Sequence, residues 1–119
     1  RATKAVMAAH DRMPVLVFDE IDANLGGEMG HAVGRELAGV ATRHQVICIT
    51  HLPQVAAHGT LHHAVRKIVR DGRTFTQVDR LEEKARIEEL ARMLGGGDSR
   101  AALAHAVEML ARARRKLPR

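Results

Sequence analysis

Residues 15–18 form an uninterrupted apolar run, Val-Leu-Val-Phe, which ends directly in Asp19 and Glu20. A short β-branched and aromatic run without polar alternation predicts a strand that is buried on both faces. Strands of this kind belong to parallel sheets, which need a crossover connection, usually a helix, before the next strand. The chain is therefore expected to be an α/β protein with two carboxylates at the carboxyl end of a strand.

A helix and a second strand follow, as a parallel sheet requires. Apolar side chains recur at helical spacing between Glu28 and about Thr42, and residues 46–49 form a second strand of the buried type. The apolar helix positions are Met29, Val33, Leu37 and Val40. Within this helix Gly30 and Gly34 are four residues apart, so they share one face and allow a sheet or partner to approach closely.

The two strands of such a βαβ unit run in the same direction and end at the same edge of the sheet. Asp19 and Glu20, at the end of the first strand, are therefore expected beside Thr50 and His51, which follow the second.

The flanking segments predict a helix before this unit and a β-hairpin after it. Residues 2–10 are rich in alanine and contain no helix breaker, and Pro14 then ends the helix. Residues 64–70 and 74–78 lie on either side of Asp71 and Gly72, a pair that suits a type I′ turn because both residues tolerate positive φ.

Two helices are expected at the carboxyl-terminal end. Asp79 and Glu82 resemble a capping box for the first of them, and the glycines at 95–97 end it. The second helix begins near Asp98 and Ser99. The apolar stripes expected to face the core are Ile87, Leu90, Ala91 and Leu94 in the first helix, and Leu103, Val107 and Leu110 in the second.

Composition bounds the class of protein. The chain has 119 residues, of which 45% are hydrophobic, which suits one globular domain or one lobe of a larger one. It has two Phe, no Trp and no Tyr, which disfavours stacking on the bases of single-stranded nucleic acid. Cys48 is the only cysteine and lies in an apolar strand, so a buried, inert thiol is expected. There is no apolar stretch long enough to span a membrane and no signal-peptide pattern, so a cytoplasmic location is expected.

The net charge of +5 equals the charge of residues 112–119 alone. Two interpretations of this basic tail are open. It can be a solvated helix end whose cations complement the helix dipole, or it can contact the phosphates of DNA.

The strand that ends in Asp19 and Glu20 matches the pattern of a Walker B motif, and its chemistry explains each part. Asp19 can hold Mg²⁺, commonly through a water molecule. Glu20 can orient and deprotonate the water that attacks a γ-phosphoryl group. The pattern alone is equally compatible with a strand that simply ends in solvated acids.

The surrounding residues favour the catalytic interpretation, because their order resembles that of ABC/SMC-type ATPases. Asp22 follows the acidic pair, a glycine pair opens the helix, and His51 follows the second strand. The resemblance implies that Asp22 is the acid of the D-loop, which crosses a dimer interface, and that His51 is the switch histidine that contacts the γ-phosphate.

Within that class the chain most resembles the bacterial RecN-type DNA repair ATPases. The resemblance rests on Phe-Asp-Glu-Ile-Asp at 18–22, on Ile-Thr-His-Leu-Pro-Gln-Val-Ala at 49–56 and on residues 84–96, which begin Lys-Ala-Arg-Ile-Glu-Glu-Leu-Ala-Arg-Met. It implies the C-terminal lobe of a P-loop ATPase head, with ATP and Mg²⁺ as cofactors and Asp19, Asp22 and Gln54 among the nucleotide-binding residues. It also implies a head-to-head homodimer that acts on double-stranded DNA ends in repair and recombination, in the bacterial cytoplasm with the nucleoid and with no membrane partner.

The chain departs from the family pattern in two ways. In the D-loop, Asn24 and Gly26 stand where the family has Gly and Ser; Asn still tolerates a left-handed conformation, but the Ser hydroxyl is lost. There is also no G-x-x-x-x-G-K-[ST] sequence, no Ser-Gly-Gly-Glu signature and no coiled-coil segment. We therefore expect a fragment that needs the N-terminal lobe of the same protein and is inactive alone.

Two alternative functions and one alternative site compete with this interpretation. A non-catalytic docking or DNA-contact module would use the basic tail, and the missing P-loop supports it. An ABC transporter head is disfavoured because residues 52–56 and 86–96 resemble RecN instead. A zinc site at His58, His62 and His63 is disfavoured because no Cys or carboxylate accompanies them at ligand spacing.

Overall fold

The computed structural model describes residues 15–19 and 27–115, and it has the mixed α/β architecture that the sequence predicts. Glu20, Asp22 and the helix expected at residues 2–10 lie outside these ranges. In chain order the elements are β1 (Val15–Asp19), α1 (Gly27–Val40), β2 (Gln45–Ile49), α2 (Pro53–Ala56), β3 (His63–Arg70), β4 (Arg73–Arg80), α3 (Glu83–Met93) and α4 (Arg100–Arg114).

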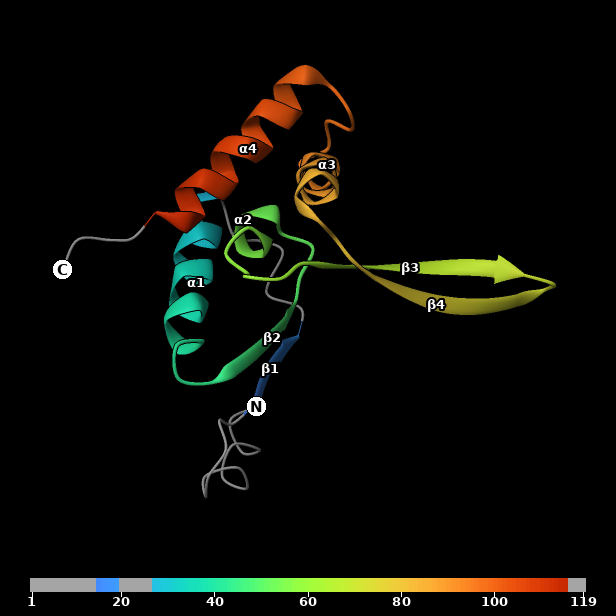
Figure 1. The fold of residues 1–119 in the computed structure, drawn as a ribbon, viewed down its shortest axis with the longest axis horizontal. Helices are drawn as coiled ribbons and strands as arrows, with labels where there is room; N and C mark the ends of the chain where they lie inside the picture. The colour runs from blue at the N-terminus through green and yellow to red at the C-terminus, as the bar shows by residue number, and fades with distance from the viewer. Residues whose placement is uncertain (1–14, 20–26, 116–119) are drawn as a thin grey trace.

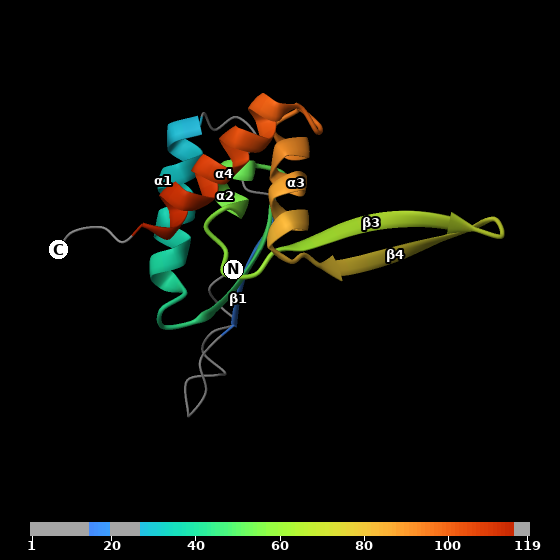
Figure 2. The ribbon, with the colours of Figure 1, turned by 45° about the horizontal axis from the view of Figure 1, so that its top comes forward.

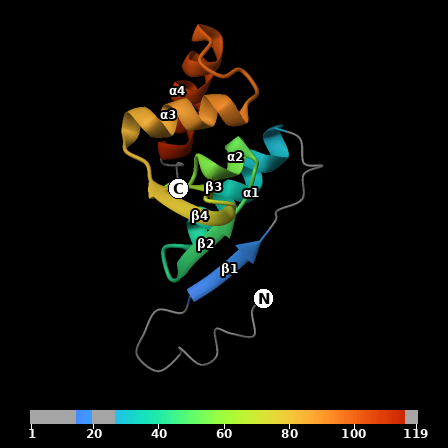
Figure 3. The ribbon, with the colours of Figure 1, turned by 90° about the vertical axis from the view of Figure 1, so that its right-hand side faces the viewer.

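β1 and β2 form the expected parallel pair, with α1 as the crossover between them. Figure 3 shows the two strands side by side and pointing the same way. The register pairs Val15 with Gln45 and Asp19 with Ile49. The βαβ prediction is therefore confirmed, and both strands end at the same edge.

β3 and β4 form the expected antiparallel hairpin, whose register pairs His63 with Arg80 and Arg70 with Arg73. Asp71 and Gly72 both have positive φ, 54° and 74°, as a type I′ turn requires. The hairpin extends away from the rest of the molecule as an arm (Figure 1).

The capping box predicted for α3 is wrong. Asp79 lies within β4, where its carboxylate accepts hydrogen bonds from Arg66 and Gln77. These contacts hold Asp79 in the hairpin, so β4 continues to Arg80. The N-cap of α3 is Glu82, which makes no side-chain capping bond.

The core lies between α2, α3 and α4. α3 buries Leu90 and Ala91, which confirms the stripe expected for that helix. α4 begins as predicted, with the Ser99 hydroxyl accepting from the Ala102 N–H at 3.1 Å. Its buried face differs from the prediction, because Val107 is 50% exposed and Ala106 takes the position toward α3. A period of 3.6 residues permits either position, and the smaller alanine allows the two helices to approach closely. Figure 2 shows α3 and α4 beside α2 and α1.

α1 is buried through its glycines rather than its apolar side chains. Gly30, His31 and Gly34 are its buried residues, whereas Met29 is 56% exposed. A Cβ built on Gly30 would lie 3.0 Å from Gln54 Cβ, and one on Gly34 would lie 2.4 Å from a ring carbon of His58. The predicted close approach is thus confirmed, with α2 and the residues just after it as the partner.

The two strand pairs leave large apolar surfaces open. On β1 and β2, one face is half-buried and the other is exposed, and the exposed residues are Val15, Val17, Ile47 and Ile49. On the hairpin the exposed apolar residues are Val65, Val69, Phe75 and Val78. Parallel strands are normally covered on both faces, so the β1–β2 pair has one face without a covering element among the described residues.

Candidate functional site

The candidate site is the edge where β1 and β2 end. Because Asp19 is paired with Ile49, the next two residues after β2, Thr50 and His51, follow directly beside the carboxyl end of β1. Asp19 and His51 are both exposed. The two strand ends that lead to these residues therefore lie at one edge of the sheet, as predicted. Glu20, which was assigned to the same edge, and Asp22, which was assigned to the D-loop, lie outside the described residues.

A tight turn connects β2 to α2 and fixes where His51 stands. The Thr50 hydroxyl accepts from the Leu52 N–H at 3.0 Å, and the Leu52 carbonyl accepts from the N–H groups of Val55 and Ala56. Pro53 occupies the first helical turn, where its missing N–H costs nothing. His51 thus lies in a short segment that the Thr50 hydroxyl spans and that backbone hydrogen bonds to Leu52 connect to α2.

Gln54 lies on α2, against the start of α1. It is half-buried, and its Cβ is the atom that a side chain at Gly30 would meet first. Its amide nitrogen lies 3.9 Å from where a Cβ on Gly27 would stand. Gln54 therefore lies beside the first turn of the helix that follows the predicted D-loop, on the same side of the fold as the strand ends.

Arg86 is a residue that sequence reasoning placed in a family motif but not in the core. Only 4% of its surface is exposed, and Nη2 donates to the carbonyl oxygens of Ala56, Ala57 and Gly59 at 3.1, 3.3 and 2.6 Å. Burial is the main factor that lowers the pKa of its guanidinium, with Arg114 also contributing. The sequence could have indicated this burial, because Arg86 directly precedes Ile87, which belongs to the apolar stripe of α3.

His31 and His58 meet where α1 contacts the end of α2. His31 Nδ1 and His58 Nε2 are 3.4 Å apart, and the rings are nearly perpendicular. Burial lowers the pKa of both imidazoles, and nearby cations, including Arg112, lower it further. His58 thus faces His31. In the described ranges, no group of three His, Cys, Asp or Glu side chains is placed to hold a metal ion.

The basic tail begins with two arginines that have acidic partners. Arg112 makes two hydrogen bonds to Glu28, at 3.0 and 2.9 Å, and Arg114 makes two to Glu83, both at 2.9 Å. These pairs connect α4 to the starts of α1 and α3. For these two arginines the geometry favours a structural role at the helix end over free phosphate contacts. Lys116 and Arg119 lie outside the described residues.

Cys48 is half-buried on β2, and burial raises the pKa of its thiol. A thiol whose pKa is raised is less nucleophilic at neutral pH, which agrees with the inert thiol that the sequence predicts.

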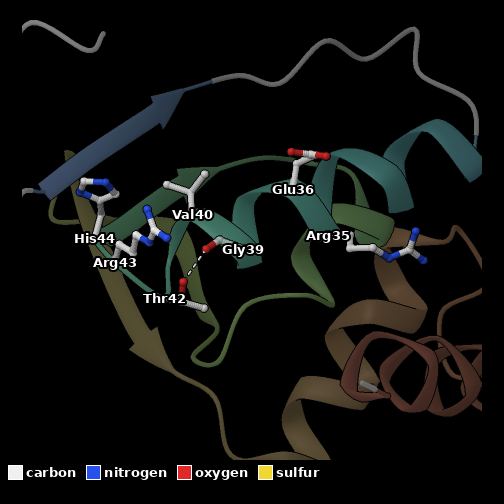
Figure 4. Close-up of a pocket in the computed structure, with 7 residues that line it drawn as sticks. All are labelled: Arg35, Glu36, Gly39, Val40, Thr42, Arg43 and His44. Atoms are coloured by element: carbon white, nitrogen blue, oxygen red, sulfur yellow. Dashed lines mark hydrogen bonds between the residues drawn. The ribbon is translucent and has the colours of Figure 1, made fainter. Parts of the chain in front are cut away.

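A shallow depression lies at the other end of β2. It is lined by seven residues at the end of α1 and in the following turn: Arg35, Glu36, Gly39, Val40, Thr42, Arg43 and His44 (Figure 4). The Thr42 hydroxyl donates to the Gly39 carbonyl at 2.8 Å, and Figure 4 shows Arg35 and Arg43 at opposite ends of the depression. These polar groups do not converge, and the strand ends that bear Asp19 and His51 are at the opposite end of the sheet.

Comparison with curated proteins finds similar sequences under one name. The chain is 48% identical to the DNA repair protein RecN of Xylella fastidiosa over 99 residues, which cover 81% of the chain and 18% of that protein. It is 49% identical to RecN of Deinococcus radiodurans over 98 residues, which cover 82% of the chain and 17% of that protein. It is 40% identical to RecN of Haemophilus influenzae over 110 residues, which cover 92% of the chain and 20% of that protein. By sequence, this chain belongs with RecN.

The chain spans about a fifth of the length of these RecN relatives. No protein-family model matches it. Within the part of the chain that the structure describes, no helix is both long enough and apolar enough to cross a membrane.

The sequence assigns a metal-binding role to Asp19 in this RecN-like chain. Asp19 is exposed at the end of β1, and among the described residues its carboxylate forms no ion pair. Carboxylate oxygens are the ligands that Mg²⁺ prefers, and one or two of them commonly suffice because the ion keeps several waters. The metal role that the sequence assigns to Asp19 stays a prediction.

Proposed function

We propose that this chain supplies the catalytic strand edge of a RecN-like ATPase that acts in DNA repair. The observation that supports the proposal best is the parallel register of β1 and β2, which pairs Asp19 with Ile49, two residues before His51. Phosphoryl transfer to water needs a metal ligand, a group that activates water and a donor to the γ-phosphate at one place. The similarity to proteins named DNA repair protein RecN supports the process.

Each residue has a separate task in this proposal. Asp19 would hold the metal ion, and the ion would help to orient the phosphates. Glu20, the next residue, accepts the proton of the attacking water. His51 donates a hydrogen bond to the γ-phosphate oxygens as negative charge develops there. Mg²⁺ bound at this edge would neutralise the charge on the β- and γ-phosphates of ATP.

Asp22 and Gln54 complete the proposed nucleotide contacts. Gln54 lies beside the start of α1, on the side where the strands end. Asp22 would act across the interface of a head-to-head homodimer, and opening and closing of that dimer would act on double-stranded DNA ends. In this proposal the phosphates are gripped by a P-loop outside the present sequence, since these 119 residues contain none.

The open faces of the strands indicate where the rest of such an ATPase head would bind. Val17 and Ile49 on β1 and β2, and Val65 and Val69 on the hairpin, are between 47% and 72% exposed. Covering apolar surface of this extent is favourable by about 25 cal/mol per Å². Because the RecN relatives are about five times as long as the matched segment, we propose that their additional residues supply the covering lobe.

Replacing Glu20 by Gln in the full-length protein tests the catalytic assignment. Glu20→Gln removes the proton acceptor but keeps the size of the side chain, so ATP binding should persist. Turnover should fall by about a hundredfold or more, at the lower end of what general bases contribute. Both quantities are measured on one preparation, by nucleotide binding and by phosphate release.

Glu88→Gln is the matched control, since Glu88 is an exposed carboxylate on α3, far along the chain from the strand edge. It should leave both quantities unchanged. ATP hydrolysis at the normal rate by Glu20→Gln would contradict the assignment of Glu20 as the base.

A further inference from the structure

Arg86 is a buried cation whose hydrogen-bond partners are neutral. Its three acceptors are the backbone carbonyls of Ala56, Ala57 and Gly59, at the carboxyl-terminal end of α2 and in the turn that follows. In the described part of the chain it forms no ion pair with a carboxylate. Burying a charge without an opposite charge is costly, so an aliphatic residue would pack here more cheaply if only packing mattered.

The hydrogen bonds of Arg86 instead anchor the carboxyl-terminal end of α2. The last carbonyls of a helix have no partner within the helix and carry partial negative charge, which a cation can satisfy. α2 has only four residues, so its own hydrogen bonds hold it weakly. Arg86 connects this short helix to α3, which is fixed in the core by Leu90 and Ala91.

α2 is also held from its other side. Gly30 and Gly34 of α1 lie against Gln54 and His58, with no room for a methyl group at Gly34. α2 is thus confined between α1 and the guanidinium of Arg86. The segment that leads into it contains His51, and the Leu52 carbonyl is hydrogen-bonded to the first turn of α2. Any shift of α2 must therefore move the turn that presents His51.

We infer that Arg86 is a positioning residue that fixes α2, and with it His51 and Gln54, in the place where they meet the nucleotide. The inference rests on the proposed function for its catalytic consequence. Arg86 itself touches backbone carbonyls only and acts through α2.

The test uses the full-length protein and compares Arg86→Met with Arg86→Lys. Methionine removes the donor and keeps most of the aliphatic length. Lysine restores a cation, and because Nη2 alone makes all three bonds, one ammonium group with three N–H donors can replace part of the anchor. Arg92→Met is the matched control on the same helix, since the Arg92 side chain is 67% exposed and pairs with Glu89.

The first measurement is hydrogen exchange of the amides of Ala57, His58 and Gly59, which donate to carbonyls within α2 and its turn. Arg86→Met should make them exchange faster, Arg86→Lys should restore part of the protection, and Arg92→Met should change nothing. If the exchange rates of these amides were unchanged in Arg86→Met, the conclusion that Arg86 holds α2 in place would be wrong.

The second measurement is ATP turnover in a double-mutant cycle with His51→Ala. In a protein with His51, Arg86→Met should lower kcat by about tenfold to a hundredfold, the scale of a small misplacement of a catalytic group. On the His51→Ala background the same change should lower kcat by a clearly smaller factor, because only the part of the loss that acts through Gln54 remains. Both are measured well below the unfolding temperature, so that the folded fraction is equal.

The possible outcomes distinguish a failure of the positioning role of Arg86 from a failure of the proposed function. Equal losses on both backgrounds would mean that Arg86 does not act through His51, and would overturn the positioning role. Normal turnover by His51→Ala would overturn the proposed function and the catalytic consequence of Arg86 together, whereas the exchange measurement would still report on the anchor itself.

Discussion

The helices α2 to α4 and the two strand pairs differ in how completely they bury their own apolar residues. Leu90, Ala91 and Ala106 have no exposed surface, whereas Val65 and Val69 on the hairpin are 65% and 72% exposed. The difference teaches that the helical region contains its own core, while the described strands keep much of their apolar surface exposed.

The largest expected effect is in the helical core. Leu90→Ala leaves a cavity between α3 and α4 and should lower the free energy of unfolding by about 2–5 kcal/mol. Val69→Ala removes a similar apolar volume from an exposed position and should cost less than about 1 kcal/mol, chiefly through strand propensity. Urea unfolding of the two variants measures both values.

If Leu90→Ala and Val69→Ala lowered the free energy of unfolding equally, the contrast between a buried helical core and an exposed hairpin would be contradicted. Such a result would mean that Val69 is covered in solution, although it is exposed in the structure. In the full-length protein, by contrast, the cost of Val69→Ala should rise if the proposed lobe covers it.

The next effect concerns the contact between α1 and α2. Gly34→Ala places a methyl group 2.4 Å from His58 Cδ2, so the ring or the helix must move. We expect a loss of about 1–3 kcal/mol, the usual range for overpacking. Gly39→Ala, in the same helix, meets open space and should stabilise by about 0.5–1 kcal/mol through higher helix propensity.

Thermal unfolding of both glycine variants measures these effects. A neutral Gly34→Ala would show that α2 can move away from α1 at little cost, and would weaken the idea that the segment bearing His51 is rigidly held.

The sequence predicted the fold where local chemistry and hydrophobic period agree. The parallel pair, the type I′ turn at Asp71 and Gly72 and the cap at Ser99 follow from such signals. The capping box at Asp79 was wrong because two strand neighbours compete for the same carboxylate. That competition depends on the hairpin register, which capping preferences do not contain.

The sequence predicted less about how the elements pack. The assignment of Val107 to the core was wrong because the crossing of α3 and α4 selects Ala106, and a helical period does not choose between adjacent positions. The burial of Arg86 depends on where the end of α2 falls in space. In the candidate site, Asp19 and His51 could be placed from strand direction alone, whereas the roles of Glu20, Asp22 and Gln54 stay predictions that depend on the family resemblance.

The smallest expected effect is a pH dependence that belongs to the helical region. Burial lowers the pKa of His31 and His58, so between that lowered value and the ordinary value of about 6.5 the unfolded chain binds more protons than the folded one. The stability that the neutral pair contributes is thus fully present above about pH 6.5 and falls as the pH drops below it. His58→Gln should reduce this fall, measured as urea midpoints between about pH 5 and pH 7.5, a range chosen to lie above most carboxylate pKa values. His63→Gln, an exposed change in β3, should leave the fall intact. If both variants reduce it equally, the pH dependence does not come from the contact between α1 and the end of α2, and the separation of the molecule into a self-contained helical region and open strands would need a different explanation.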